Sequence, residues 1–244
     1  MWIVIGKWRL LGSIWLITGM FVAVISITFV GNEQYIATFA IDTVGAPMVI
    51  VDAGHGGEDG GAVSDDGVIE SQLNLAIATK LYQTLQLIGI PSLMTRETDI
   101  SLHDGDAQTI REKKVSDLEN RVALINTYPQ SVVLSVHQNS LPTSPVTHGA
   151  QCFYNHVAVA KPLAAAVQYI LNETVNIGNE KNDKSIGTGI YLMDNATVPV
   201  VIIECGFLTN SDETALLQTQ QHQMTLALSI TVGYGQSLEI EDIT

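Results

Sequence analysis

Apolar and polar residues follow one another along the chain in blocks that predict alternating strands and helices. An apolar run at residues 47–53, closed by glycines, is typical of a strand buried on both faces. Similar short runs predict further strands at residues 91–95, 131–136, 150–154, 190–193 and 198–203. Helical spacing of apolar residues predicts helices at residues 72–87, 118–125, 157–173, 212–218 and 221–237. This alternation predicts an α/β fold with a mostly parallel central sheet and helices on both faces.

The longest apolar run lies near the N-terminus, where residues 10–30 contain no charged side chain. A helix of 21 residues rises about 30 Å, which matches the hydrocarbon core of a bilayer, so this run predicts a transmembrane helix. Lys7 and Arg9 precede the run, and positive charge on that side predicts a cytoplasmic N-terminus. The alternative is a cleaved signal peptide, but its apolar region usually has about 7–15 residues. We therefore predict a single-pass anchor in the cell membrane, with the folded domain on the extracytoplasmic side.

These patterns divide the chain into five segments of different kinds. We predict a cytoplasmic N-terminus, a transmembrane anchor, a juxtamembrane stalk, one folded domain and a short tail, at residues 1–9, 10–30, 31–45, 46–238 and 239–244. The folded domain is long enough to bury one sizeable core. Within it, residues 97–116 are polar and charged, and we predict that they lie on the surface.

The charge and the cysteine content limit the classes of partner and of fold. Lys and Arg number 11 against 25 Asp and Glu, which gives a formal net charge of −14. Such a chain lacks the basic stripe that neutralises phosphates, so we expect no nucleic-acid partner. The two cysteines, Cys152 and Cys205, are too few for a disulfide framework, and we predict that both are buried free thiols.

Four polar residues stand where the predicted strands end or where the first helix begins. His55, His137 and Glu204 each follow a buried strand, and Glu70 lies at the entrance of the first helix. Ligand sites in an open parallel sheet form just beyond the carboxyl ends of the strands. We therefore expect these four side chains to converge on one edge of the sheet.

Two imidazoles and one carboxylate are a typical catalytic zinc set that leaves one position open. A further carboxylate supplies the general base and acid that a hydrolase needs. The glycines around His55 suit a tight turn, in which the backbone passes close to a metal or substrate. A phosphate cradle is excluded, because no glycine follows Gly56 at the required spacing and no Gly-Lys-Ser/Thr occurs. The Asp104-Gly105-Asp106 turn has only a weak similarity to a calcium-binding loop.

Three sequence blocks carry a resemblance to a known family. They read VIVDAGHGGEDGGAV followed by Glu70, then LSVHQNS, then VPVVIIECGFLTN. In order, spacing and flanking residues they resemble the zinc-dependent N-acetylmuramoyl-L-alanine amidases, over roughly residues 46–237. The resemblance implies that His55, Glu70 and His137 bind Zn²⁺ and that Glu204 is the catalytic carboxylate.

The same resemblance implies a substrate and a biological setting. The enzyme would hydrolyse the amide between the lactyl group of muramic acid and L-alanine in peptidoglycan. Residues 97–122 look like those of sporulation and germination-specific amidases that act on spore cortex. An activating protein partner is compatible with this reading. One rival is a zinc carboxypeptidase with a similar ligand set, but its usual His-x-x-Glu pair is missing, because Glu58 stands three residues after His55 while the matching block places the ligand at Glu70. The other rival is an inactive wall-binding scaffold, which the intact Glu204 disfavours.

Two further residues near these blocks receive a structural interpretation. Cys205 follows Glu204 directly, and neighbouring residues of a strand point to opposite faces, so we predict no nucleophilic role. Arg121, on the helix before the second block, is predicted to form an ion pair on the helix surface. The other histidines, His103, His148, His156 and His222, are predicted to be surface or satisfied side chains.

Overall fold

A computed structural model describes residues 45–241 of the chain. The elements, in chain order, are β1 (Met48–Ala53), α2 (Glu70–Leu87), β2 (Ser92–Met94), α3 (Ile110–Asn126), β3 (Ser131–Asn139), β4 (Gln151–Tyr154), α4 (Ala160–Thr174), β5 (Lys184–Ser185), α5 (Tyr191–Asn195), β6 (Val200–Phe207), α6 (Ser211–Leu217) and α7 (Gln220–Glu241). The predicted α/β class is confirmed.

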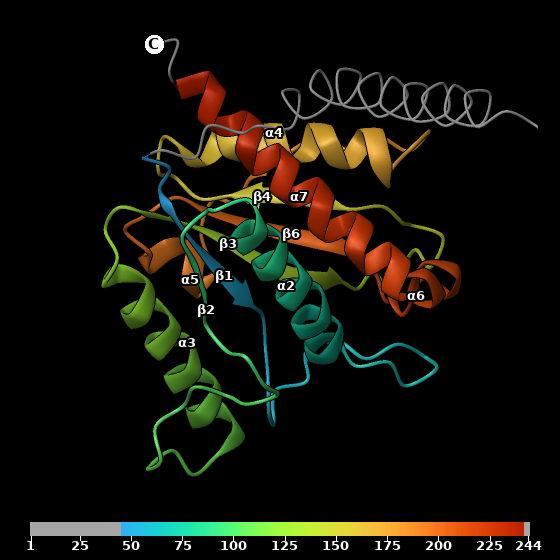
Figure 1. The fold of residues 1–244 in the computed structure, drawn as a ribbon. Helices are drawn as coiled ribbons and strands as arrows, with labels where there is room; N and C mark the ends of the chain where they lie inside the picture. The colour runs from blue at the N-terminus through green and yellow to red at the C-terminus, as the bar shows by residue number, and fades with distance from the viewer. Residues whose placement is uncertain (1–44, 242–244) are drawn as a thin grey trace, which may run out of the picture. The chain divides into compact units, whose positions relative to one another are not determined.

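One six-stranded sheet forms the centre of this domain, in the order β2-β1-β3-β6-β4-β5 (Figure 1). All neighbouring strands are parallel except β4 and β6, which are antiparallel, so the sheet is mixed. The exception has a simple cause. The connection between β3 and β4 contains no helix, and a parallel strand would need a crossover connection of about a dozen residues or more.

Helices cover both faces of the sheet, as predicted. Alternate residues of β1 point in opposite directions, so Val49 and Val51 join a core formed with α2, α4 and α7. Ile50 joins a second core formed with α3 and α5 on the other face (Figure 1). Because both faces are covered, the central strands read as continuous apolar runs in the sequence.

Three local predictions differ from the structure. Residues 190–193 were predicted to form a strand but contribute to the short helix α5. The two-residue strand β5 was not predicted, since Lys184 and Ser185 are exposed and carry no apolar signal. Helix α3 begins at Ile110, eight residues before the predicted start, because Thr109 and Glu112 form a capping box there. The predicted surface segment, residues 97–116, therefore includes the first turns of this helix.

The predicted transmembrane helix, residues 10–30, lies outside the described residues, as do residues 1–9 and most of the stalk. From residue 45 to residue 241 no helix is both long and apolar enough to cross a membrane. Helix α7 runs to Glu241 and so enters the predicted tail.

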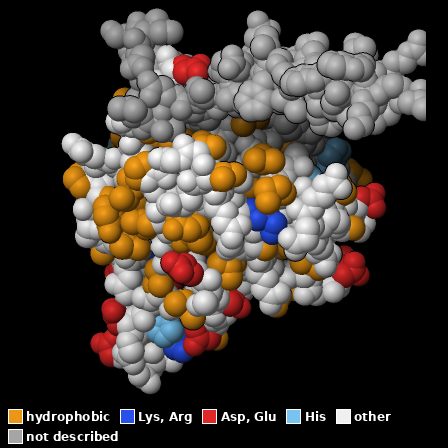
Figure 2. All heavy atoms as spheres, viewed as in Figure 1, with side chains coloured by type: hydrophobic (Ala, Val, Ile, Leu, Met, Phe, Trp, Pro, Cys, Tyr) orange, Lys and Arg blue, Asp and Glu red, His pale blue; other side chains and the backbone are white. Residues whose placement is uncertain are grey.

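On the face drawn in Figure 2, acidic side chains are scattered and no continuous basic stripe is visible.

Candidate active site

Three of the predicted site residues meet at the carboxyl edge of the sheet. The carboxylate oxygen Oε1 of Glu70 lies 3.3 Å from His55 Nε2 and 3.0 Å from His137 Nδ1. One candidate ligand atom from each residue lies within 4.8 Å of the other two, and no other such group was found among the described residues. The structure thus brings together the three predicted metal ligands.

Glycines make this close approach possible. A Cβ atom on Gly54 would lie 2.2 Å from the His137 ring, and one on Gly61 would lie 2.5 Å from Glu70 Oε2. His55 itself has a φ of 60°, a conformation that few residues with a side chain adopt. The predicted tight turn around His55 is confirmed, and its glycines leave room for the imidazole and carboxylate groups.

Glu70 is held by donors from three parts of the chain. Its carboxylate accepts hydrogen bonds from the backbone N–H of Ala62 at 2.8 Å, from that of Gln138 at 3.1 Å and from Asn74 Nδ2 at 3.2 Å. Burial alone would raise the pKa of Glu70, but hydrogen bonds with His137 and His55 and their charges lower it. The group is therefore an ionised carboxylate aimed at two imidazoles.

A second carboxylate orients His55 from behind. Asp59 Oδ2 lies 2.8 Å from His55 Nδ1, which leaves Nε2 facing Glu70. Burial alone would lower the pKa of His55, but the hydrogen bonds with Asp59 and Glu70 raise it to about 9. A carboxylate on the far nitrogen fixes the tautomer and orientation of a metal-binding histidine. Asp59 was not among the predicted site residues.

Glu204 faces the same cavity from β6. Both this residue and His137 were predicted to follow the ends of their strands, and this prediction is wrong, because β3 and β6 extend to Asn139 and Phe207 and so contain His137 and Glu204. The two residues are direct partners in the parallel register. The buried atom Oε2 of Glu204 has no hydrogen-bond partner. Burial and the neighbouring charge of Glu70 raise the pKa of Glu204 to about 7, although the charges of His137 and His55 oppose the shift.

A cavity of about 280 Å³ adjoins His55, Asp59, His137 and Glu204. Its lining includes His55, His137 and Glu204, with Lys114 from α3 and Tyr191 from α5 at its other walls. The cavity has the composition of a hydrolytic centre, since it combines potential metal ligands, a carboxylate with a raised pKa and side chains that can contact a substrate.

Comparison with known proteins agrees with this geometry. The family model described as N-acetylmuramoyl-L-alanine amidase matches residues 49–235, which is more than half of the chain. The chain belongs to this family. Its activity is that of an N-acetylmuramoyl-L-alanine amidase, a hydrolase of the cell wall.

Individual relatives of this amidase support the same family assignment. The germination-specific N-acetylmuramoyl-L-alanine amidase of Bacillus subtilis is 34% identical, over 76% of this chain and 77% of its own. The CwlD amidase of Clostridioides difficile, solved in complex with the GerS lipoprotein, is 34% identical with a TM-score of 0.76, over 80% of this chain and 99% of its own. The catalytic domain of CwlV from Bacillus (Paenibacillus) polymyxa is 26% identical with a TM-score of 0.66, over 80% of this chain and 99% of its own.

Two buried arginines hold the loop of the amidase that carries His55. Arg96 donates to the carbonyl oxygens of Ala53 and Gly54, at 2.9 and 3.1 Å. Arg121 donates to those of Ala53 and His55, at 2.9 and 2.7 Å. The predicted surface ion pair of Arg121 is therefore wrong, because this side chain is buried against the sheet.

Arg121 is compensated by two buried carboxylates. It forms ion pairs with Asp52 at 2.6 Å and with Asp117 at 2.7 Å. Burial alone would raise the pKa of Asp52, but Arg121, Ser135 and His137 help to lower it to about 2. The four-residue spacing of Asp117 and Arg121 was the only sequence signal of this network, and it reads equally well as a surface pair.

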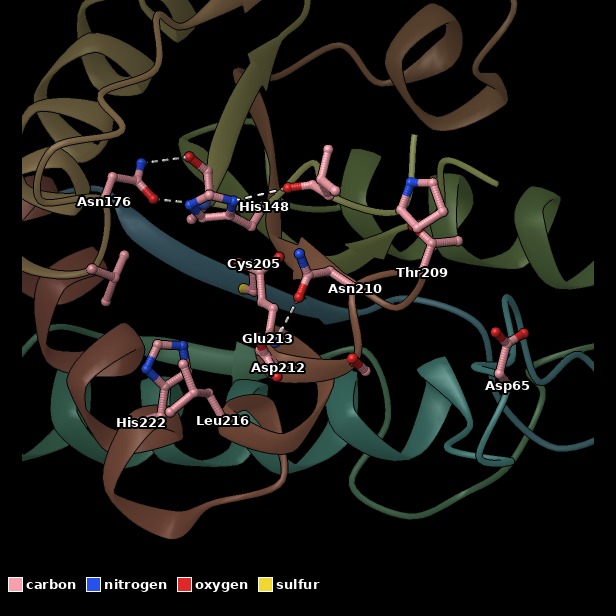
Figure 3. Close-up of a pocket in the computed structure, with 15 residues that line it drawn as sticks. Asp65, His148, Asn176, Cys205, Thr209, Asn210, Asp212, Glu213, Leu216 and His222 are labelled. Carbon is pink, nitrogen blue, oxygen red and sulfur yellow. Dashed lines mark hydrogen bonds between the residues drawn. The ribbon is translucent and has the colours of Figure 1, made fainter. Parts of the chain in front are cut away.

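A second pocket, of about 650 Å³, lies on the opposite face of β6 (Figure 3). Cys205 lines it, whereas its neighbour Glu204 lines the cavity with the histidines, so the predicted opposite orientation is confirmed. Cys205 and Cys152 are free and buried, as predicted, and burial raises the pKa of both thiols. His148 and His222, at the walls of this pocket, do not join the metal-ligand cluster.

Proposed function

We propose that this amidase uses zinc held by His55, Glu70 and His137, and that Glu204 is its general base and acid. The observation that carries the proposal is the placement of a partnerless carboxylate oxygen of Glu204 in the cavity that the two imidazoles line. The bond to be hydrolysed joins the lactyl group of muramic acid to L-alanine of the stem peptide.

The donor set fits zinc. Two histidine nitrogens and one carboxylate oxygen are a common catalytic zinc set with an open position for water or substrate. Glu70 and His55 also carry the supporting hydrogen bonds that such ligands usually have. When bound, zinc lowers the pKa of water and polarises the amide carbonyl.

Glu204 handles the proton in this scheme. A carboxylate with a pKa of about 7 is suited to accept a proton from water and to return it near neutral pH. The proton passes to Glu204 as water adds to the carbonyl carbon, and then to the nitrogen of L-alanine as the C–N bond breaks. The products are a free stem peptide and an intact glycan strand.

The rival carboxypeptidase reading is weaker for this chain. It would use Glu58, three residues after His55, as a ligand. Glu58 instead forms an ion pair with Lys113, and its side chain is 47% exposed. Glu58 is also absent from the group of candidate ligands. Glu70, which is buried and touches both histidines, is the better third ligand.

Mass spectrometry of digested peptidoglycan tests the bond assignment. We expect free stem peptides that begin with L-alanine and glycan strands without peptide. A zinc chelator should stop the reaction, and added zinc should restore it. Shortened stem peptides still attached to glycan would support the carboxypeptidase, and no product with zinc present would support the scaffold.

We also propose that the catalytic domain is held outside the cell by a transmembrane helix at residues 10–30. The support is the uncharged length of this segment and the preceding Lys7 and Arg9. A chain that starts at about residue 36 should be soluble and folded. If residues 1–35 prove necessary for folding in water, the proposal is wrong.

A role in germination and a protein partner complete the proposal. The support is the likeness to the Bacillus subtilis germination-specific amidase and to the CwlD amidase, whose structure is a complex with the GerS lipoprotein. Loss of the gene should leave stem peptides on spore cortex and impair germination. Turnover by the purified chain should rise when extracytoplasmic lipoproteins of the same cells are added, and an unchanged rate would contradict the partner.

A further inference from the structure

We propose that Lys114 binds a substrate carboxylate next to the scissile amide, namely the free α-carboxylate of the second stem-peptide residue. That residue is a glutamate joined to the next one through its side-chain carboxyl group, so its α-carboxylate is available. The inference rests on the proposed function, because it concerns peptide recognition in the same cavity. It adds a specificity-determining residue that bond hydrolysis itself does not require.

Lys114 stands at the wall of the catalytic cavity. It lines this cavity together with His55, His137 and Glu204. Its ammonium lies 3.2 Å from Asp59 Oδ2, and the same oxygen lies 2.8 Å from His55 Nδ1. The ammonium is therefore separated from the first imidazole by a single carboxylate oxygen. Its side chain is 51% exposed, so a substrate can reach it.

Among the described residues that line this cavity, Lys114 is the cation that remains available. Arg121 also lines it, but its guanidinium is buried and directed to Asp52, Asp117 and backbone carbonyl oxygens. A lysine ammonium has three N–H donors, and the contacts to Asp59 occupy at most two of them. One donor and part of the positive charge are left for a ligand.

The distances in the substrate agree with this placement. The scissile nitrogen belongs to L-alanine, and the next Cα atom along the peptide lies about 3.8 Å from that of alanine. The α-carboxylate of the second residue is therefore roughly 6 Å from the scissile bond. Because Lys114 lines the same cavity as His55, His137 and Glu204, we infer that a substrate group at this distance from the scissile bond can reach its ammonium.

The charges around the cavity favour a contact between Lys114 and a substrate carboxylate. The chain has a net charge of −14, and the carboxylates of Asp52, Asp59, Asp117 and Glu204 line the cavity. These negative charges would repel a substrate carboxylate unless a nearby cation formed an ion pair with it. Lys114 places a cation in this lining, and it shares its charge with Asp59.

The competing explanation is that Lys114 only holds Asp59, and through it His55, in place. The two explanations differ in what they predict for substrates. A positioning role affects every substrate alike, because it acts on the catalytic centre. A carboxylate-binding role affects only substrates that carry the carboxylate.

The test uses the full-length protein and two synthetic disaccharide-tripeptides that differ only in the second residue, which has an α-carboxylate in one and an α-carboxamide in the other. We expect the unmodified protein to prefer the carboxylate by about fivefold in kcat/KM, as befits a half-exposed ion pair. Lys114→Met should reduce the preference to less than about twofold, and Lys114→Arg should retain it.

Lys113→Met is the matched control, because Lys113 is the adjacent lysine and pairs with Glu58 outside the cavity. It should keep the full preference. Equal cleavage of both substrates by the unmodified protein, or an equal loss on both with Lys114→Met, would overturn the proposal. So would failure to cleave the carboxylate substrate by a preparation that digests peptidoglycan. Failure to release stem peptides from peptidoglycan itself would instead contradict the amidase function.

Discussion

Two carboxylates, one on each side of β3, differ in their partners and therefore in their chemistry. Asp52 on β1 is paired with Arg121 and accepts hydrogen bonds from Ser135 and Thr95, and its pKa is lowered to about 2. Glu204 on β6 has a buried oxygen without a partner, and its pKa is raised to about 7. Burial raises the pKa of both carboxyl groups, so the partners decide the charge state.

The difference separates a supporting region from a reacting one. Around Asp52 and the two arginines, donors and acceptors are matched, and the network fixes the loop that carries His55. Around Glu204 an acceptor is left open, and a native buried polar group without a partner calls for an explanation such as catalysis. The amidase thus combines a matched hydrogen-bonded frame with a carboxylate that we propose to exchange a proton in the reaction.

The largest expected effect is on the reacting region. His137→Ala removes one of three proposed ligands, so we expect loss of bound zinc and of all measurable hydrolysis. Metal analysis and stem-peptide release on the same preparation provide the measurement. His156→Ala, at an exposed histidine outside the cluster, is the control. Full zinc occupancy in His137→Ala would remove this residue from the ligand set.

The next effect is on the supporting region. Arg121→Met leaves Asp52 and Asp117 buried without their cation, which should cost about 3–5 kcal/mol in the free energy of unfolding. Urea denaturation measures this cost. Arg111→Met, at an exposed arginine of the same helix, should change it by less than about 0.5 kcal/mol. A similarly small change for Arg121→Met would mean that the network does not support the fold.

The pH dependence of stability gives a smaller effect with a definite sign. The pKa of Asp52 is about 2 in the folded protein and 3.8 ordinarily, so its ionised form stabilises the fold. This contribution, about 2 kcal/mol, is fully present above pH 4 and is lost as the pH falls toward 2. Unfolding free energies across this range should therefore fall less steeply for Asp52→Asn. Parallel curves for the two proteins would contradict the assignment.

The smallest effect concerns Asp59, the carboxylate that contacts His55. Asp59→Asn keeps a hydrogen-bond acceptor for His55 but removes the charge behind the imidazole. We expect about tenfold weaker zinc binding by calorimetry, with little change in melting temperature. Glu58→Gln, which alters the neighbouring carboxylate without contact to His55, should bind zinc normally. Equal affinity in both variants would argue against a role for Asp59.

The sequence predicted the reacting region better than the supporting one. His55, Glu70, His137 and Glu204 stand in compact motifs, and the ends of parallel strands must share one edge of the sheet. The strands that position them were visible as apolar runs. Their ends were not, because His137 and Glu204 are polar residues that continue the ladder of β3 and β6.

The supporting region was harder to foresee because long-range packing decides it. Arg96 and Arg121 bind carbonyl oxygens of a loop more than 40 residues earlier in the chain, and nothing local marks them as buried. The antiparallel direction of β4 likewise depends on the tertiary path of its connection. Helix α5 was mistaken for a strand because a short apolar run has no clear period.

Isosteric replacement of the two carboxylates tests the central claim most directly. Glu204→Gln should fold with a normal melting temperature and keep its zinc, yet lose about 10²–10⁴-fold in stem-peptide release. Asp52→Asn should lose stability and keep most of its turnover per folded molecule. Zinc content, melting temperature and peptide release are measured on one preparation of each. Near-normal turnover in folded, zinc-loaded Glu204→Gln would contradict the account.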